Sequence, residues 1–109
     1  MPSAVHLGYC TCPDLASAES LAESLIESGL AACVNILPGL TSIYRWQGTL
    51  TKEAEVLLLI KTTEERVPEL AAHIQERHPY DVPEVIFHPI VAGLDSYLEW
   101  VRICTNKSA

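Results

Sequence analysis

The aliphatic stretch Val56-Leu57-Leu58-Leu59-Ile60 is the longest of its kind in this chain of 109 residues. Neighbouring side chains of a β-strand point to opposite faces of a sheet, so a strand that is apolar at every position must be covered on both faces. We therefore predict that residues 54–62 form a central strand. The stretch is far shorter than the roughly 20 apolar residues that a membrane-spanning helix needs, and we expect no membrane partner.

Alternating, β-prone residues on either side predict the other strands of the same sheet. These strands cover residues 4–12, residues 31–37 with a continuation over 41–47, and residues 85–92. Pro38-Gly39 interrupts the second strand and predicts a bulge or turn, because proline cannot donate to a sheet ladder. Gly48 and the polar residues up to Lys52 predict the hairpin turn into the central strand. Pro89 suggests that the last strand lies at an edge or contains a bulge.

Apolar residues that recur three and four positions apart predict helices between the strands. The first helix is expected to start after an Asp14 cap and to end at Gly29. The second starts at a Thr62–Glu65 capping box and ends at His78, and Asp95 caps a short third helix. The order β-α-β-β-α-β-α is the split βαβ pattern of a ferredoxin-like α+β sandwich with an added C-terminal helix.

The predicted sandwich leaves one face of its sheet without helices, because two helices can cover only one face. The central strand is apolar on that second face as well, so another layer has to cover it. The simplest cover is a second copy of the chain. We expect a single domain over residues 1–109 that assembles with itself.

The charge balance argues against nucleic acid as a partner. Fourteen acidic residues against seven Lys and Arg give a formal charge of −7 at pH 7, and the basic residues are scattered between Arg45 and Lys107. Binding to phosphates requires clustered cations. The N-terminal residues lack the basic segment of a secretory signal, so we expect a cytoplasmic protein with reduced thiols rather than disulfides.

The first predicted strand places His6, Cys10 and Cys12 on one face, because they lie four and two positions apart. Thiolates and imidazoles are ligands that Cu(I), Cu(II) and Zn(II) prefer, so a transition-metal site is chemically reasonable. In the competing interpretation the cysteines are small buried hydrophobic residues. His78 also has two interpretations, because it could join Cys10 in a site or cap carbonyls at the end of the second helix.

No catalytic motif accompanies these residues. A Cys-His pair could act as a nucleophile, but no catalytic signature surrounds the cysteines. Neither the G-x-G-x-x-G nor the G-x4-G-K-[ST] phosphate loop occurs in the sequence. We therefore expect a protein that is not an enzyme.

Aromatic residues gather on the outer half of the second predicted strand. Tyr44 and Trp46 share one face there, where they either anchor an interface or pack within the subunit. Three charged residues flank this region, namely Lys61, Glu53 and Glu84. Their simpler interpretation is that they are ordinary surface ions.

Taken together, several short motifs resemble the CutA family of divalent-cation-tolerance proteins. They follow the family's order over nearly the whole chain, and they are Cys10-Thr11 with Pro13-Asp14, residues 29–35, Pro38-Gly39, residues 42–48, residues 61–63, His78-Pro79-Tyr80, Pro83-Glu84 and residues 97–100. The resemblance implies a ferredoxin-like subunit in a tight homotrimer with an architecture similar to that of PII signalling proteins. It also implies tolerance of divalent cations, chiefly copper, with Cys10 and His78 as the metal ligands. Some members have His-His where this chain has Arg77-His78.

We therefore predict a cytoplasmic homotrimer that binds a transition metal, with copper as Cu(I) or Cu(II) as the first candidate and other divalent cations as alternatives. Its metal ligands would be Cys10 and His78. The alternative is a PII-like trimeric scaffold or small-molecule sensor on which metals act only indirectly. It would use a cleft between subunits near Trp46, Lys61 and Glu84, with Tyr44 and Trp46 as interface anchors.

Overall fold

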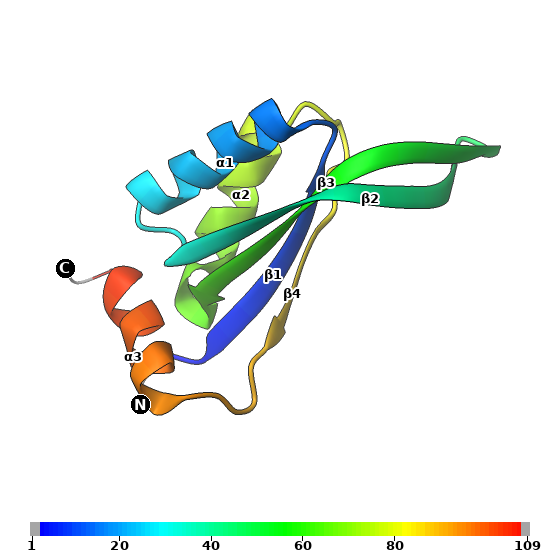
Figure 1. The fold of residues 1–109 in the computed structure, drawn as a ribbon. Helices are drawn as coiled ribbons and strands as arrows, with labels where there is room; N and C mark the ends of the chain where they lie inside the picture. The colour runs from blue at the N-terminus through cyan, green and yellow to red at the C-terminus, as the bar shows by residue number, and fades with distance from the viewer. Residues whose placement is uncertain (1–2, 108–109) are drawn as a thin grey trace.

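The aliphatic run lies in β3, which occupies the middle of a four-stranded antiparallel sheet of order β2-β3-β1-β4. The computed structural model describes residues 3–107. Its elements are β1 (Val5–Cys12), α1 (Leu15–Glu27), β2 (Cys33–Trp46), β3 (Thr49–Thr63), a 3₁₀ turn (Glu64–Arg66), α2 (Val67–Arg77), β4 (Val85–Pro89) and α3 (Asp95–Cys104). Helices α1 and α2 lie side by side on one face of the sheet (Figure 1). The ferredoxin-like α+β fold with an added C-terminal helix is confirmed.

Local sequence signals set the ends of α1 as predicted. The Asp14 carboxylate accepts a hydrogen bond from the Ser17 amide at 2.7 Å, which caps the first turn. At the other end Gly29 has φ +71°, and the amides of Gly29 and Leu30 donate to the carbonyls of Ile26 and Leu25. This pattern is a Schellman motif, which favours glycine because a left-handed conformation strains residues with a Cβ.

The predicted starts of the other two helices are wrong. β3 continues through Thr63, and the Thr62 hydroxyl donates to the Leu30 carbonyl at 2.7 Å instead of capping a helix. A tertiary hydrogen bond has therefore replaced the local cap. Asp95 is the first residue of α3 and its cap position is Leu94, so the carboxylate acts through the helix dipole rather than by capping.

Strands β2 and β3 form a long hairpin with a tighter turn than predicted. Gln47 and Gly48 both have positive φ, 50° and 81°, as a two-residue type I′ turn requires. β3 therefore begins at Thr49 rather than after Lys52, because a two-residue turn returns the chain directly into the ladder. A bulge lies between Leu37 and Leu40, as Pro38-Gly39 predicted. Beyond Val56, where pairing with β1 ends, residues 40–55 project as a two-stranded hairpin arm (Figure 1).

β4 lies at the edge of the sheet, as Pro89 suggested. The strand ends at Pro89 rather than continuing to Ala92. One more backbone hydrogen bond follows, from the Ile90 amide to the Val5 carbonyl at 2.8 Å. The predicted strand was too long because the apolar run from Ile90 to Ala92 leaves the sheet.

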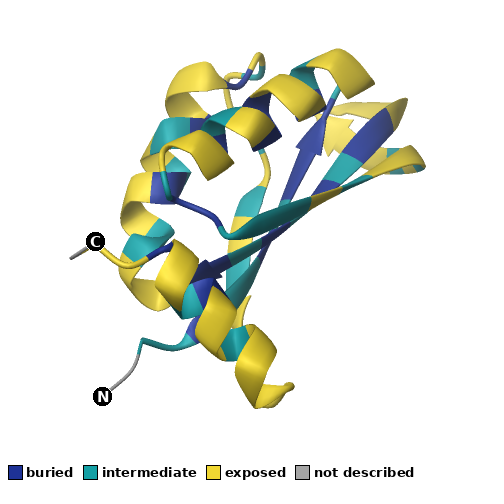
Figure 2. Cartoon of the chain, turned by 60° about the vertical axis from the view of Figure 1, so that its left-hand side comes forward, coloured by how far each residue is buried: buried dark blue, intermediate teal, exposed yellow. Residues whose placement is uncertain are grey.

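The two faces of the sheet differ in how far they are covered. On the helical face Leu58 and Ile60 are fully buried against residues of α1 and α2. Figure 2 shows buried segments in the strands beneath the helices. The opposite face, which we call the open face, carries Leu7, Tyr9, Leu57, Leu59 and Ile86, all of them partly or largely exposed. The described helices are all too short or too polar to span a bilayer.

Gly8 is required for close packing between β1 and β4. An added Cβ would lie 2.5 Å from Cε2 of Phe87, whose ring packs against the core. We predict that Gly8→Ala lowers the free energy of unfolding by about 1–3 kcal/mol, the usual effect of overpacking, measured by guanidinium unfolding. Phe87→Leu in the same protein should restore part of the loss. Wild-type stability for Gly8→Ala would contradict this packing.

Candidate metal centre

Two cysteines and one histidine form a buried cluster at the end of β1. The ligand atoms of Cys10, Cys12 and His78 all lie within 4.8 Å of one another. Both thiols are fully buried, and the imidazole is 8% exposed. Among residues 3–107 these three form the one group of histidine, cysteine or acidic side chains that is close enough to hold an ion together.

The backbone explains why these three side chains meet. Cys10 and Cys12 are two residues apart on β1, so both face α1 and α2. His78 occupies the C-cap of α2, where its amide donates to the Ile74 carbonyl at 2.8 Å. Pro79 follows, and a residue before proline avoids the helical conformation, which turns His78 towards β1.

The imidazole of His78 is held from both sides. Its Nε2 donates to the Thr11 carbonyl at 2.8 Å, and its Nδ1 accepts a hydrogen bond from the Tyr80 amide at 3.1 Å. The backbone partners fix the neutral tautomer with the proton on Nε2, because an amide must donate and a carbonyl must accept. An ion can therefore bind His78 only by replacing one of these two hydrogen bonds.

The two thiols share one hydrogen bond, and it separates their acidities. The hydrogen bond to Cys12 raises the pKa of the Cys10 thiol, and burial and nearby negative charge raise it further. The same hydrogen bond lowers the pKa of the Cys12 thiol, against the opposing effect of burial. Ionisation of the pair therefore favours the Cys12 thiol, while the Cys10 S–H also donates to the Thr11 carbonyl at 3.8 Å.

A cavity of about 330 Å³ reaches the cluster from the surface. Serine side chains of α1 line it on one side, and Arg77 and His78 line it on the other. Cys12 also lines this cavity, whereas Cys10 does not. The thiol with the lowered pKa is therefore the one that borders this cavity.

The structure brings Cys10 and His78 together and adds Cys12, which the sequence offered only through its alternating spacing with Cys10. His6 shares their face but lies four residues from Cys10, or about 13 Å along the strand, and stays outside the cluster. All four cysteines are free thiols.

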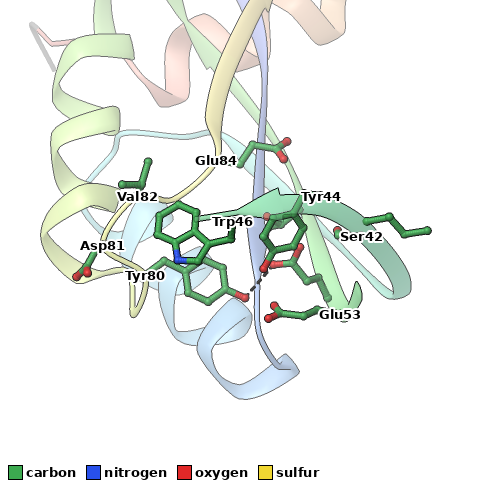
Figure 3. Close-up of a pocket in the computed structure, with 11 residues that line it drawn as sticks. Ser42, Tyr44, Trp46, Glu53, Tyr80, Asp81, Val82 and Glu84 are labelled. Atoms are coloured by element: carbon green, nitrogen blue, oxygen red, sulfur yellow. Dashed lines mark hydrogen bonds between the residues drawn. The ribbon is translucent and has the colours of Figure 1, made fainter. Parts of the chain in front are cut away.

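The residues predicted for a cleft are only partly together. Tyr44, Trp46 and Glu84 line a second cavity, of about 580 Å³, between the hairpin arm and the segment of residues 80–84 (Figure 3). Lys61 lies elsewhere in the chain, with its ammonium against the side chains of Asn35 and Cys33. Sequence reasoning missed Glu55, whose buried carboxylate carried no distinguishing motif.

Fold and cluster together define a class: a ferredoxin-like domain with a buried thiol–imidazole group of the kind that binds soft metal ions. Residues 6–104 match the family model described as "CutA1 divalent ion tolerance protein". The chain belongs to this family.

Proteins from distantly related organisms are similar to this chain in sequence and in structure. The chain is 50% identical over 92 residues to the divalent-cation tolerance protein CutA of Thermus thermophilus, covering 84% of this chain and 89% of that protein. It is 43% identical over 107 residues to human protein CutA, covering 98% of this chain but 60% of the human protein. The crystal structure of CutA1 from Oryza sativa superimposes with a TM-score of 0.94 at 43% identity, covering 97% of each chain.

We predict that iodoacetamide modifies Cys12 at lower pH than Cys10, because the shared hydrogen bond favours the Cys12 thiolate. In Cys10→Ala the donor is lost, so the Cys12 profile should move to higher pH. Peptide mass spectrometry after alkylation between pH 6 and 10 measures the modified fraction of each cysteine. The exposed Cys104 is the internal control and should react identically in both proteins. Earlier reaction at Cys10 would refute the assignment.

Proposed function

We propose that this chain acts in divalent-cation tolerance by binding copper at Cys10, Cys12 and His78, without catalysing a reaction. The observation that carries the proposal is the cluster itself, with three ligand atoms within 4.8 Å of one another in a buried site. Family membership supports the link to divalent ions.

The donor set favours Cu(I) over the other candidate ions. Thiolates are soft ligands that select Cu(I), whereas structural zinc sites require four ligands. Binding would convert the Cys10 thiol into a thiolate and release its proton, so affinity should increase with pH. Arg77 stands where some relatives have a second histidine, and Cys12 would supply the missing ligand.

We also propose that the protein is a homotrimer with PII-like architecture in the cytoplasm. The partly exposed Leu57 and Leu59 on the open face support assembly, because they belong to the central strand. Tyr44 and Trp46 on the hairpin arm are 38% and 48% exposed and would anchor the interface. A cytoplasmic location would keep both thiols reduced for metal binding.

Isothermal titration with Cu(I) and with Cu(II) tests the metal centre. We expect saturable binding by the wild type that is at least tenfold weaker in Cys10→Ser, Cys12→Ser and His78→Ala, because each removes one ligand. Cys33→Ser is the matched control, since its thiol lies outside the cluster. Equal binding by all five proteins would exclude these ligands.

Light scattering coupled to size exclusion tests the assembly. We expect about three times the subunit mass of 12.0 kDa. Leu59→Glu should reduce the trimer to smaller species, because it places a charge on the open face without entering the helical core. A monomeric wild type at micromolar concentration would refute the trimer.

A further inference from the structure

The imidazole of His78 uses both of its nitrogens in hydrogen bonds to the backbone. Its Nε2 donates to the Thr11 carbonyl at 2.8 Å, and its Nδ1 accepts from the Tyr80 amide at 3.1 Å. A neutral imidazole has one N–H and one free lone pair. The Tyr80 amide therefore occupies the lone pair that a metal ion needs.

Binding an ion through either nitrogen of His78 breaks the same hydrogen bond. An ion on Nδ1 takes the lone pair directly from the Tyr80 amide. An ion on Nε2 displaces the Thr11 carbonyl and leaves the ring proton on Nδ1, where two donors then face each other. The Tyr80 amide loses its acceptor in both cases, so this loss is a necessary consequence of metal binding at His78.

Tyr80 also holds a residue of the hairpin arm. Its hydroxyl donates to Oε2 of Glu55 at 2.9 Å, and Glu55 is only 7% exposed (Figure 3). Glu55 lies at the root of the arm, directly before Val56, where pairing with β1 ends. The residue that His78 anchors through its amide thus anchors the arm through its side chain.

The segment between these two contacts is short and stiff. The ring centroids of His78 and Tyr80 lie 4.8 Å apart, with their planes tilted by 48°. Pro79 stands between them, and its ring restricts the backbone angle φ. A movement of the imidazole towards an ion is therefore passed on to Tyr80, because the intervening residue cannot absorb it.

We propose that copper binding at His78 releases the Tyr80 amide and thereby loosens the contact of Tyr80 with Glu55, so that the hairpin arm responds to the occupancy of the metal centre. The coupling rests on the proposed copper site and adds regulation to it. The arm also carries Tyr44 and Trp46, the proposed anchors between subunits. Because coupling between two sites is reciprocal, the Tyr80–Glu55 contact must in turn oppose copper binding.

This reciprocity predicts that removing a distant hydroxyl tightens copper binding. Tyr80→Phe lacks the contact that copper has to loosen, so we expect Cu(I) to bind about two- to tenfold more tightly than in the wild type, the equivalent of one hydrogen bond. Glu55→Gln weakens the same contact and should act in the same direction. Tyr97→Phe removes a phenol hydroxyl on α3 and should bind like the wild type. Competition with a colorimetric Cu(I) chelator measures each affinity.

Hydrogen exchange of the Tyr80 amide, followed by NMR on the intact protein, tests the broken hydrogen bond directly. We expect faster exchange in the Cu(I)-loaded protein than in the metal-free protein. His78→Ala should show the fast exchange without copper, because it removes the acceptor. The Leu30 amide, which donates to the Leu25 carbonyl at the far end of α1, is the control and should exchange equally in all samples.

The possible failures are distinguishable. Unchanged exchange of the Tyr80 amide on Cu(I) loading would overturn the coupling and leave the metal centre intact. Equal or weaker Cu(I) binding by Tyr80→Phe would do the same, because the hydroxyl would then be either irrelevant to the site or a support for it. A wild type that binds no Cu(I) would overturn the metal centre and the coupling together.

Discussion

Strand β3 has to bury apolar side chains on both faces, and most of the architecture follows from this requirement. Its helical face is satisfied within the chain, where Leu58 and Ile60 pack beneath α1 and α2. Its other face, with Leu57 and Leu59, remains only partly covered. The central position of β3 also determines where the two cysteines lie. They belong to β1, which pairs with the half of β3 that runs beneath the helices.

The parts of the fold that could be predicted depend on local chemistry. Asp14 caps α1 and Gly29 ends it because both act within one helical turn. The Pro38-Gly39 bulge was likewise visible, since proline and glycine disturb any ladder. The predicted capping box at Thr62 was wrong because the Thr62 hydroxyl donates instead to the Leu30 carbonyl, 32 residues away in the chain. No local pattern reveals that competition.

The candidate metal centre was predictable in part for the same reason. The alternation of Cys10 and Cys12 placed two thiols on one face, and the second helix was predicted to end at His78. Their convergence required the tertiary fold. The hydrogen bonds of His78 to Thr11 and Tyr80 could not be anticipated either, because they depend on how α2 crosses β1. Glu55 lacked any signal, since a single glutamate before an apolar run is typical of an exposed strand end.

The segment His78-Pro79-Tyr80 connects the two faces of the sheet. His78 contacts the backbone of β1 beside the thiols, and Tyr80 reaches Glu55 in the cavity on the other side. The Tyr80 amide also donates to His78, which joins both contacts into one unit. Replacing His78 removes the acceptor of the Tyr80 amide and so also loosens the residue that supports Glu55. One substitution at His78 then removes a proposed metal ligand and also disturbs Tyr80 in the cavity wall. Only variants that affect one of these two residues alone can assign a phenotype to either.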